Sequence, residues 1–396
     1  MRRGRRKSAA AVLAIAAIGA VGAVAATSSS AASTPITIGW AYDATGSMAP
    51  FDMPALAAAQ LRVKQINAKG GVSGHPLKIA TCKTQGNKPA VAKACALKLI
   101  SGGAKVVFST CDVDLGAPVV QEAINRGILA VSPCIGTDQM GPKRFGKKGA
   151  LAFSYGNVAQ DEGSAMADFA WSKGWKTAAL ATDGVIVYFK DVVAAFKARF
   201  QQLGGKIADE ETYHSLGGHD VNNTISRLQG VKADVIVTAT AGAFGALSTL
   251  VSGLRSAGDN TPILNSWAGD GTYWLPKSPA VTNYWYVTFA SVFGDDPNPT
   301  VKAMAKQIKA ATGGFVTGPA AIDGVATAIR RAHGSTDGAK LASIMQSFKD
   351  VSTLSGEVSF SSKWHTVFGR QYRVMSINDN KAKFVKLIRA KVVPTI

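Results

Sequence analysis

The stretch that decides the fold runs from Ile36 to Thr81. It contains an apolar run, ITIGW (36–40), a loop, AYDATGSMAPFDMP (41–54), and a second apolar run, LKIAT (77–81). Short apolar runs bounded by turn residues are typical of buried strands. Because a parallel strand pair needs a long crossover connection, the stretch predicts one parallel α/β unit with a ligand-sized loop after its first strand.

The connection between these strands carries a helical pattern. Its apolar residues recur at steps of three and four and predict one buried face: Leu56, Ala59, Val63 and Ile66. Pro54 favours the first turn of a helix, and Gly70-Gly71 supplies a left-handed stop. We therefore expect a helix that begins near Pro54, ends before Gly70 and packs on a sheet.

The end of this helix and the turn after it, INAKGGVSGHPL (66–77), resemble the signature INxxGGxxGxxL of the leucine/isoleucine/valine-binding family of solute receptors for ABC importers. The resemblance continues through FST (108–110), ILAVSP (128–133) and GWKTAAL (174–180), so it covers nearly the whole chain after the leader. It implies a type I periplasmic binding fold, in which two doubly wound parallel-sheet lobes, joined by a three-crossing hinge, close like a clamshell on a solute. We expect no cofactor.

The alternation of strands and helices also predicts two lobes. After the leader about 360 residues remain, more than one hydrophobic core usually serves. Strands are expected near Ile36, Leu77, Val106, Leu129 and Ala152, and then at 178–182, 206–211, 234–240 and 263–266. The resemblance implies that the block after 284 returns to the first lobe. We therefore expect a first lobe of residues 35–154 plus 286–335, and a second lobe of residues 155–285 plus 336–385.

Residues 1–32 have the layout of a secretory signal peptide. Five basic residues precede an apolar run, 9–26, and a region rich in Ser and Ala: Arg2, Arg3, Arg5, Arg6 and Lys7. Cleavage after Ala25, after Ala32 or nearby would release the mature protein, and the alternative is a membrane anchor, since the run is at the lower limit for spanning. Relatives are commonly lipid-anchored through a cysteine at this point, whereas the first cysteine here is Cys82. We expect an exported protein without that anchor.

Composition argues against several other classes of protein. The net charge of +19 falls to +14 without the five basic leader residues. Lys and Arg are scattered apart from KRFGKK (143–148) and the tail 381–391, so we expect solvated faces and no nucleic-acid partner. The chain lacks GxSxG, HExxH and phosphate-loop motifs, and its five histidines are dispersed. We expect no enzyme, although a hydrolase site assembled by geometry alone stays open.

Ligands of parallel α/β sheets bind beyond the carboxyl ends of the strands, so the candidate binding residues follow the predicted strands. In the first lobe they are Tyr42, Ser47, Phe51, Cys111, Asp112, Cys134 and Gly136, and in the second lobe Asp183, Tyr188, Thr240, Trp267 and Asp270. Ser47 beside Gly46 could hold an anion through loop amides. Asp183 and Asp52 have an ordinary alternative role as helix caps.

The resemblance implies roles for these positions. The loops at 111–113 and 134–136 would grip an amino acid's carboxylate and ammonium through hydroxyls and amides, and Tyr188 would close over the ligand. In this chain cysteines replace the hydroxyl residues, and Trp267 stands where an acid should pair with the ammonium. Asp270 could substitute only in a remodelled loop. A short-chain amide, an aromatic acid or another carboxylate therefore competes with an amino acid as ligand.

Aromatic residues gather near the predicted strand ends: Tyr42, Phe51, Tyr188, Trp267, Tyr273 and Trp274. They predict a pocket richer in aromatic surface than an aliphatic amino acid needs. The alternative for each is a rim or core position, because aromatic side chains dominate packing everywhere.

Four cysteines in an exported chain favour disulfides. We prefer Cys82 with Cys95, which ties a strand end to the following helix, and Cys111 with Cys134, which joins neighbouring strand ends at the pocket mouth. The alternative for the second pair is two buried free thiols. No metal site is expected, since no histidine lies at ligand spacing.

The resemblance implies a monomeric extracytoplasmic receptor that delivers a small organic solute to the permease subunits of an ABC importer. The alternative is a ligand-sensing domain for a signalling partner, which shares the fold.

Overall fold

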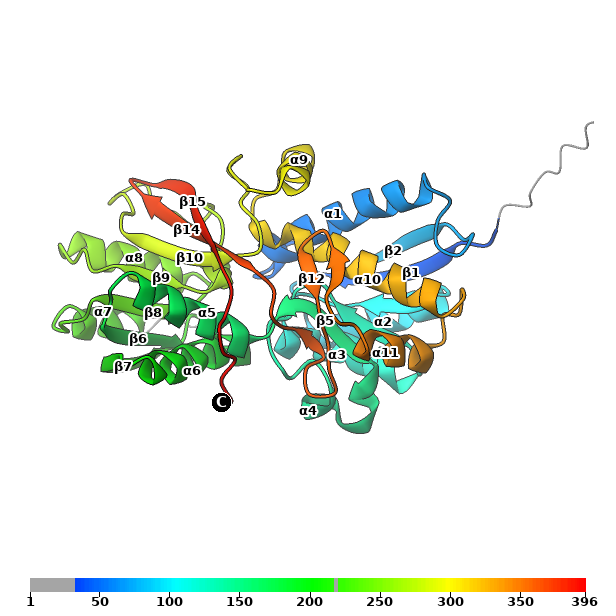
Figure 1. Cartoon of the computed structure of the whole chain (residues 1–396), viewed down its shortest axis with the longest axis horizontal. Coiled ribbons are helices and arrows are strands. Elements are labelled where there is room, and N and C mark those ends of the chain that lie inside the picture. The colour runs from blue at the N-terminus through cyan, green and yellow to red at the C-terminus, as the bar shows by residue number, and fades with distance from the viewer. Residues whose placement is uncertain (1–32, 217–219) are drawn as a thin grey trace, which may run out of the picture. The chain divides into compact units, whose positions relative to one another are not determined.

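The computed structural model describes residues 33–216 and 220–396, so the predicted signal peptide lies outside the described residues. The first of two large sheets has six parallel strands in the order β13-β5-β4-β3-β1-β2 (Figure 1). They are β1 (Ile36–Tyr42), β2 (Leu77–Lys83), β3 (Val106–Phe108), β4 (Leu129–Ser132), β5 (Ala152–Asn157) and β13 (Thr366–Val367). One face is covered by α1 (Ala49–Asn67), α10 (Thr317–Arg331) and α11 (Gly338–Gln346), and the other by α2 (Pro89–Ser101) and α3 (Val113–Asn125).

The strand β1 shows how the sequence fixes these layers. Ile38 and Trp40 are fully buried in the cluster under α1 and α10, whereas Ala41 is buried in the cluster under α2 and α3, as the two-residue period of a strand requires. Gly39 lies where α2 comes close, because a Cβ at this position would be 2.9 Å from the Cβ of Leu99. The apolar run at 36–40 is therefore a strand buried on both faces.

The second sheet has seven strands in the order β15-β14-β10-β9-β8-β6-β7. They are β6 (Thr177–Asp183), β7 (Lys206–Tyr213), β8 (Val235–Ala239), β9 (Ile263–Asn265), β10 (Tyr284–Thr288), β14 (Tyr372–Asn378) and β15 (Lys381–Ile388). The helices α5 (Ala159–Ser172) and α6 (Val187–Gln202) cover one face, and α7 (Val221–Leu228) and α8 (Ala246–Ser256) cover the other. The order β7-β6-β8-β9-β10 repeats β2-β1-β3-β4-β5, and the hairpin β14–β15 adds an antiparallel edge.

Shorter elements connect these layers. They are α4 (Pro142–Phe145), η1 (Gly146–Leu151), η2 (Gly242–Phe244), η3 (Trp267–Gly269), α9 (Pro299–Ile308), η4 (Gly313–Val316), and the two-stranded sheet of β11 (Val351–Thr353) and β12 (Gly356–Val358). We call each large sheet with its covering helices a lobe. The chain passes between the lobes after β5, after β10 and after β13. The predicted fold class, two doubly wound lobes with three crossings, is confirmed.

Two segments lie in a different lobe from the one expected. The strand β10 belongs to the second sheet, where Tyr284 pairs with Ile263 of β9 and with Ile377 of β14. Consecutive strands of this kind usually lie side by side, so β10 continues the sheet rather than leaving it. The helix α11 packs on the first lobe, with Leu341 and Met345 buried in the cluster that holds β4. Only after β13 does the chain return to the second lobe.

The helix α1 begins five residues earlier than predicted. Pro50 lies in its first turn and Pro54 lies inside it. A proline inside a helix frees the carbonyl four residues earlier, and here the Pro50 carbonyl accepts a hydrogen bond from Thr312 Oγ1 at 2.9 Å. The predicted stop is confirmed, since Gly70 and Gly71 have φ angles of 91° and 78°.

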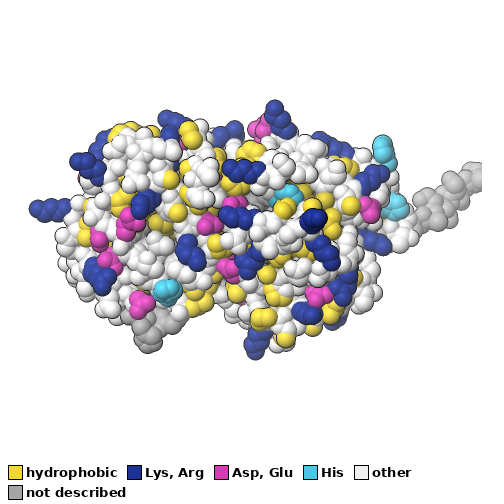
Figure 2. Space-filling model, turned by 90° about the horizontal axis from the view of Figure 1, so that it is seen from below, with side chains coloured by type: hydrophobic (Ala, Val, Ile, Leu, Met, Phe, Trp, Pro, Cys, Tyr) yellow, Lys and Arg dark blue, Asp and Glu magenta, His cyan; other side chains and the backbone are white. Residues whose placement is uncertain are grey.

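On the face shown in Figure 2, Lys and Arg side chains are spread widely with acidic side chains among them, and they form no single basic patch there. Within the described part of the chain, no helix has the length and apolar character needed to cross a bilayer.

Candidate functional site

Seven of the twelve predicted binding residues line one cavity: Phe51, Cys111, Asp112, Cys134, Gly136, Tyr188 and Trp267. The first-lobe residues come from the first turn of α1 and from the loops after β3 and β4. The second-lobe residues come from the start of α6 and from the loop after β9. These are carboxyl ends of parallel strands and the helices that follow them, where ligands of open α/β sheets bind. Both lobes therefore contribute to the cavity.

The cavity walls are largely aromatic. The ring centroid of Trp267 is 4.8 Å from that of Phe51 and 6.3 Å from that of Tyr188. The space free of atoms between the lining side chains is about 330 Å³, but only about 20 Å³ of it admits the centre of a water molecule. That is room for one or two waters. A solute the size of an amino acid can enter only if the walls move apart.

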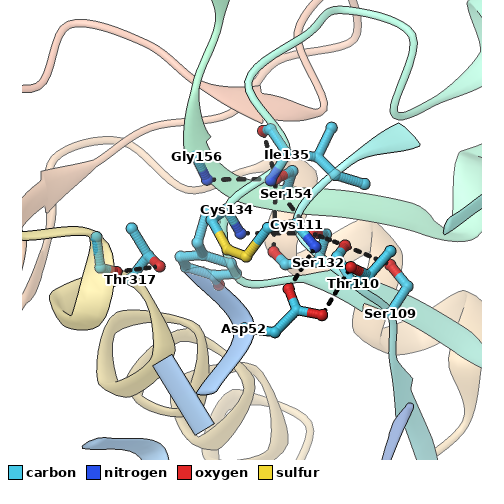
Figure 3. Close-up of a disulfide and its surroundings, with 12 residues drawn as sticks. Asp52, Ser109, Thr110, Cys111, Ser132, Cys134, Ile135, Ser154, Gly156 and Thr317 are labelled. Atoms are coloured by element: carbon cyan, nitrogen blue, oxygen red, sulfur yellow. Dashed lines mark hydrogen bonds between the residues drawn. A yellow bond between two sulfur atoms is a disulfide. The ribbon is translucent and has the colours of Figure 1, made fainter. Parts of the chain in front are cut away.

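The disulfide Cys111–Cys134 forms one wall and joins the loops after β3 and β4, as preferred from the sequence (Figure 3). The other preferred pair, Cys82–Cys95, is also bonded. The amides of Cys134 and Ile135 donate to Ser132 Oγ at 3.4 and 3.2 Å. These contacts hold the loop after β4 from within.

Asp52 of α1 lies beside this disulfide in Figure 3 and is buried. Its carboxylate accepts hydrogen bonds from the Asp43 amide (2.7 Å), Thr110 Oγ1 (2.7 Å) and the Cys111 amide (2.9 Å). Burial raises the pKa of Asp52 to about 7, although these hydrogen bonds oppose the shift. Asp52 thus ties the loops after β1 and β3 to α1 instead of capping its own helix.

Glu162 of α5 supports the second-lobe wall and was not singled out by the sequence. It is fully buried, accepts the Tyr188 hydroxyl at 2.9 and 3.0 Å on its two oxygens, and accepts the Trp267 amide at 2.7 Å. Burial raises the pKa of Glu162 to about 8. This one carboxyl group therefore positions two of the aromatic residues that the second lobe presents to the cavity, Tyr188 and Trp267.

Five predicted residues do not line the cavity: Tyr42, Ser47, Asp183, Thr240 and Asp270. The hydroxyl of Thr240 donates to Asp183 at 2.7 Å, and Asp183 also accepts the Ser215 amide at 3.1 Å. Asp270 accepts Thr288 Oγ1 at 2.7 Å and the Gly313 amide at 2.6 Å. These acids are satisfied by groups of other strands and loops, so Asp270 does not replace the acid whose position Trp267 takes.

The anion site expected around Ser47 is filled by the protein itself. The amides of Thr45 and Gly46 donate to Asp43 Oδ1 at 3.1 and 2.8 Å, and the Met48 amide donates to Asp43 Oδ2 at 3.2 Å. The aromatic residues Tyr273 and Trp274 also lie outside the cavity: Tyr273 is exposed, and Trp274 is buried against Tyr284.

Six lining residues were missed: Met48, Ile186, Phe189, Ala241, Phe244 and Ala268. Phe189 follows Tyr188 directly in the first turn of α6. Phe244 follows β8 in a short 3-10 turn. Because Phe244 follows the end of a strand, the rule used for the other candidate residues could have identified it.

Asp52, Cys111 and Cys134 bring a carboxylate and two sulfurs within 4.8 Å of one another. The two sulfurs are bonded to each other, and a disulfide offers no thiolate to a metal ion. This group of atoms therefore does not make a metal site.

The sequence is similar to a known protein family and to two of its relatives. A family model described as periplasmic binding protein matches residues 35–382. The Leu/Ile/Val-binding protein homolog 3 of Brucella melitensis is 26% identical over 335 residues, which cover 82% of this chain and 87% of that protein. The Leu/Ile/Val-binding protein BraC3 of Rhizobium johnstonii is 23% identical over 337 residues, which cover 83% and 88%.

Solved structures share the fold at low identity. The branched-chain amino acid transporter substrate binding protein LivJ of Streptococcus pneumoniae, in complex with isoleucine, has a TM-score of 0.76 and 20% identity, with 90% of this chain and 100% of that chain covered. An ABC transporter solute binding protein of Rhodopseudomonas palustris, in complex with p-hydroxybenzoic acid, has a TM-score of 0.74 and 17% identity, with 90% and 97% covered.

Proposed function

This chain belongs to the periplasmic binding protein family, and on that premise we propose that it is an exported receptor that holds a small organic solute between its lobes and delivers it to the permease of an ABC importer. One observation carries the proposal. The cavity lies at the carboxyl ends of strands in both lobes, and each lobe supplies part of its wall. A solute held there contacts both lobes only when they are together.

The mechanism follows from this division of the wall. Because the cavity admits only one or two waters, the lobes must separate before a solute enters and come together around it afterwards. A solute that contacts both walls stabilises the closed arrangement more than the open one, and so shifts the population toward closure. The permease then recognises and binds the closed arrangement of the lobes.

The solutes named for the relatives define a starting set for this site. They include isoleucine and p-hydroxybenzoic acid. We propose that the ligand is a small organic solute of similar size, and that it leaves the protein chemically unchanged.

A ligand screen tests the proposal. The purified protein is heated with a broad panel of amino acids, amides, amines, aromatic acids and sugars, and a bound solute raises the melting temperature by mass action. Each hit is then measured by small-angle X-ray scattering, where a smaller radius of gyration is expected, and the released solute is identified by mass spectrometry. Absence of any ligand-dependent compaction across the panel would count against a closing receptor.

A further inference from the structure

We propose that the cavity selects solutes without a carboxylate, and that it takes an apolar or aromatic body bearing an amide or ammonium group beside Asp112. The inference rests on the proposed function, because it names the solute class for that same site. A bound carboxylate needs free N–H or O–H donors or a cation. The described residues that line the cavity include no cation, and several of the N–H and O–H donors around it are already engaged.

Several first-lobe donors are already engaged by the chain's own acceptors. The Cys111 amide donates to Asp52 at 2.9 Å, and the Leu115 amide near the start of α3 donates to Asp112 at 3.0 Å. The amides after β4 donate to Ser132. Asp112 thus occupies the helix terminus that would otherwise attract an anion.

The second lobe repeats this arrangement. The Trp267 amide and the Tyr188 hydroxyl both donate to Glu162, at 2.7 and 2.9 Å. The Ala268 amide donates to Ser266 Oγ at 3.3 Å. The Tyr188 hydroxyl and the Trp267 backbone amide therefore point to a buried acid, while the two rings line the cavity.

Charge around the cavity is also unfavourable for an anion. Among the described residues that line it there is no Lys, Arg or His, whereas the carboxyl group of Asp112 lines it. The buried Arg370 does not compensate. It donates to Asn157 Oδ1 at 2.6 Å, and its guanidinium lies 4.9 Å from the ring centroid of Phe289.

The same features suit a neutral or positive group. Aromatic faces attract organic cations, most strongly in a dry site, and Phe51, Tyr188 and Trp267 present three rings to one space. A carboxylate has several lone-pair positions, so Asp112 can accept a solute N–H in addition to the Leu115 amide. An amide or ammonium group would donate a hydrogen bond to Asp112, whereas the negative charge of Asp112 would repel a carboxylate.

Two series of solutes with matched shape test the inference by isothermal titration calorimetry. One is benzoate, benzamide, benzylamine and benzyltrimethylammonium, and the other is leucine, leucinamide and isopentylamine. We expect the amide or amine of at least one series to bind at least tenfold more tightly than its carboxylate counterpart. Tighter binding of the carboxylate in both series, with compaction of the protein, overturns the inference and leaves the receptor function standing. Absence of binding in both series and in the broad panel overturns both.

A charge variant adds an independent readout. Asp112→Asn keeps a good helix cap but removes the negative charge, so the affinity for the amine should fall about tenfold while that for the amide changes less than threefold. Asp337→Asn is the matched control, because Asp337 caps α11 through the Lys340 amide, away from the cavity. Equal effects of Asp112→Asn on amine and amide would contradict the role of Asp112.

Discussion

The carboxylate of Asp114 accepts a hydrogen bond from the backbone N–H of Val187, with 3.0 Å between the two atoms. Asp114 lies in the first turn of α3 in the first lobe, and Val187 is the first residue of α6 in the second. The helix α6 has no side-chain cap of its own, so the other lobe supplies one. Thr137 Oγ1 donates to Asp191 of the same helix at 3.0 Å. Both contacts require the lobes to be together.

Replacing Asp114 by alanine should therefore weaken ligand binding by destabilising closure. Loss of a helix cap costs about 1 kcal/mol, which corresponds to roughly a fivefold weaker affinity if the cap exists only in the closed form. Calorimetric titration with any solute from the screen measures the change. Arg144→Ala is the control, because it removes the 2.6 Å ion pair with Asp114 but leaves the cap. Equal affinities of Asp114→Ala and the unaltered protein would exclude the cap as a closing contact.

The two disulfides should differ in what their loss affects. Removing either pair should lower the free energy of unfolding by about 2–4 kcal/mol, because each bond restricts the unfolded chain. Only the change of Cys111 and Cys134 to serine should alter ligand affinity, since that pair lines the cavity and Cys82–Cys95 does not. Denaturant unfolding and calorimetry on the two double variants separate these effects. A similar change in affinity for both variants would contradict a local role.

Much of this fold was predictable because its signals are local. Apolar runs located β1 to β9, and left-handed glycines such as Gly70 marked helix ends. The sheet to which each strand belongs was harder to predict. The apolar sequence of β10 is compatible with a strand in either lobe, and only its pairing with β9 and β14 assigns it to the second sheet. Such pairing depends on which edge is free in three dimensions, and a short stretch of sequence does not record it.

The cavity was predictable only as far as it follows strand ends. Phe51, Cys134 and Trp267 were found by position after a strand. Glu162 was not, because an acid within a helix usually faces water, and only contacts with Tyr188 and Trp267 explain its burial. Asp270 was misplaced for the opposite reason: it follows a strand but satisfies the amide of Gly313 instead of facing the cavity.

Gly136 should be intolerant of a side chain. A Cβ at this position would lie 2.7 Å from Tyr188 Cε2 and 3.1 Å from the Asn157 carbonyl oxygen. Gly136→Ala should therefore displace the Tyr188 ring, and we expect ligand affinity to fall at least tenfold with a loss of about 1–3 kcal/mol in stability. Gly230→Ala, whose Cβ would meet no atom closer than 3.6 Å, is the control. If Gly136→Ala binds the ligand as tightly as this control does, Tyr188 is not part of the binding site.

The buried carboxyl groups predict how stability depends on pH. The pKa of Glu162 is raised from 4.5 to about 8 by burial, so between these values the folded protein holds a proton that the unfolded chain releases. Stability from this group is therefore greatest below about pH 4.5 and falls as pH rises to about 8, by roughly 1 kcal/mol per pH unit. Asp52 and Asp270, whose pKa values are each raised to about 7, act in the same direction.

The variant Glu162→Gln isolates the contribution of Glu162 to the pH dependence of stability. Glutamine can still accept the Trp267 amide but does not titrate, so the fall in unfolding free energy between pH 5 and pH 8, measured with urea, should become shallower than in the unaltered protein. Asp270→Asn should flatten the same profile without changing ligand affinity, because Asp270 lies outside the cavity. Glu162→Gln should change affinity as well, since Tyr188 is held by that carboxylate. An unchanged pH profile in Glu162→Gln would mean that Glu162 is ionised in the folded protein, and that its contacts with Tyr188 and Trp267 outweigh the cost of its burial.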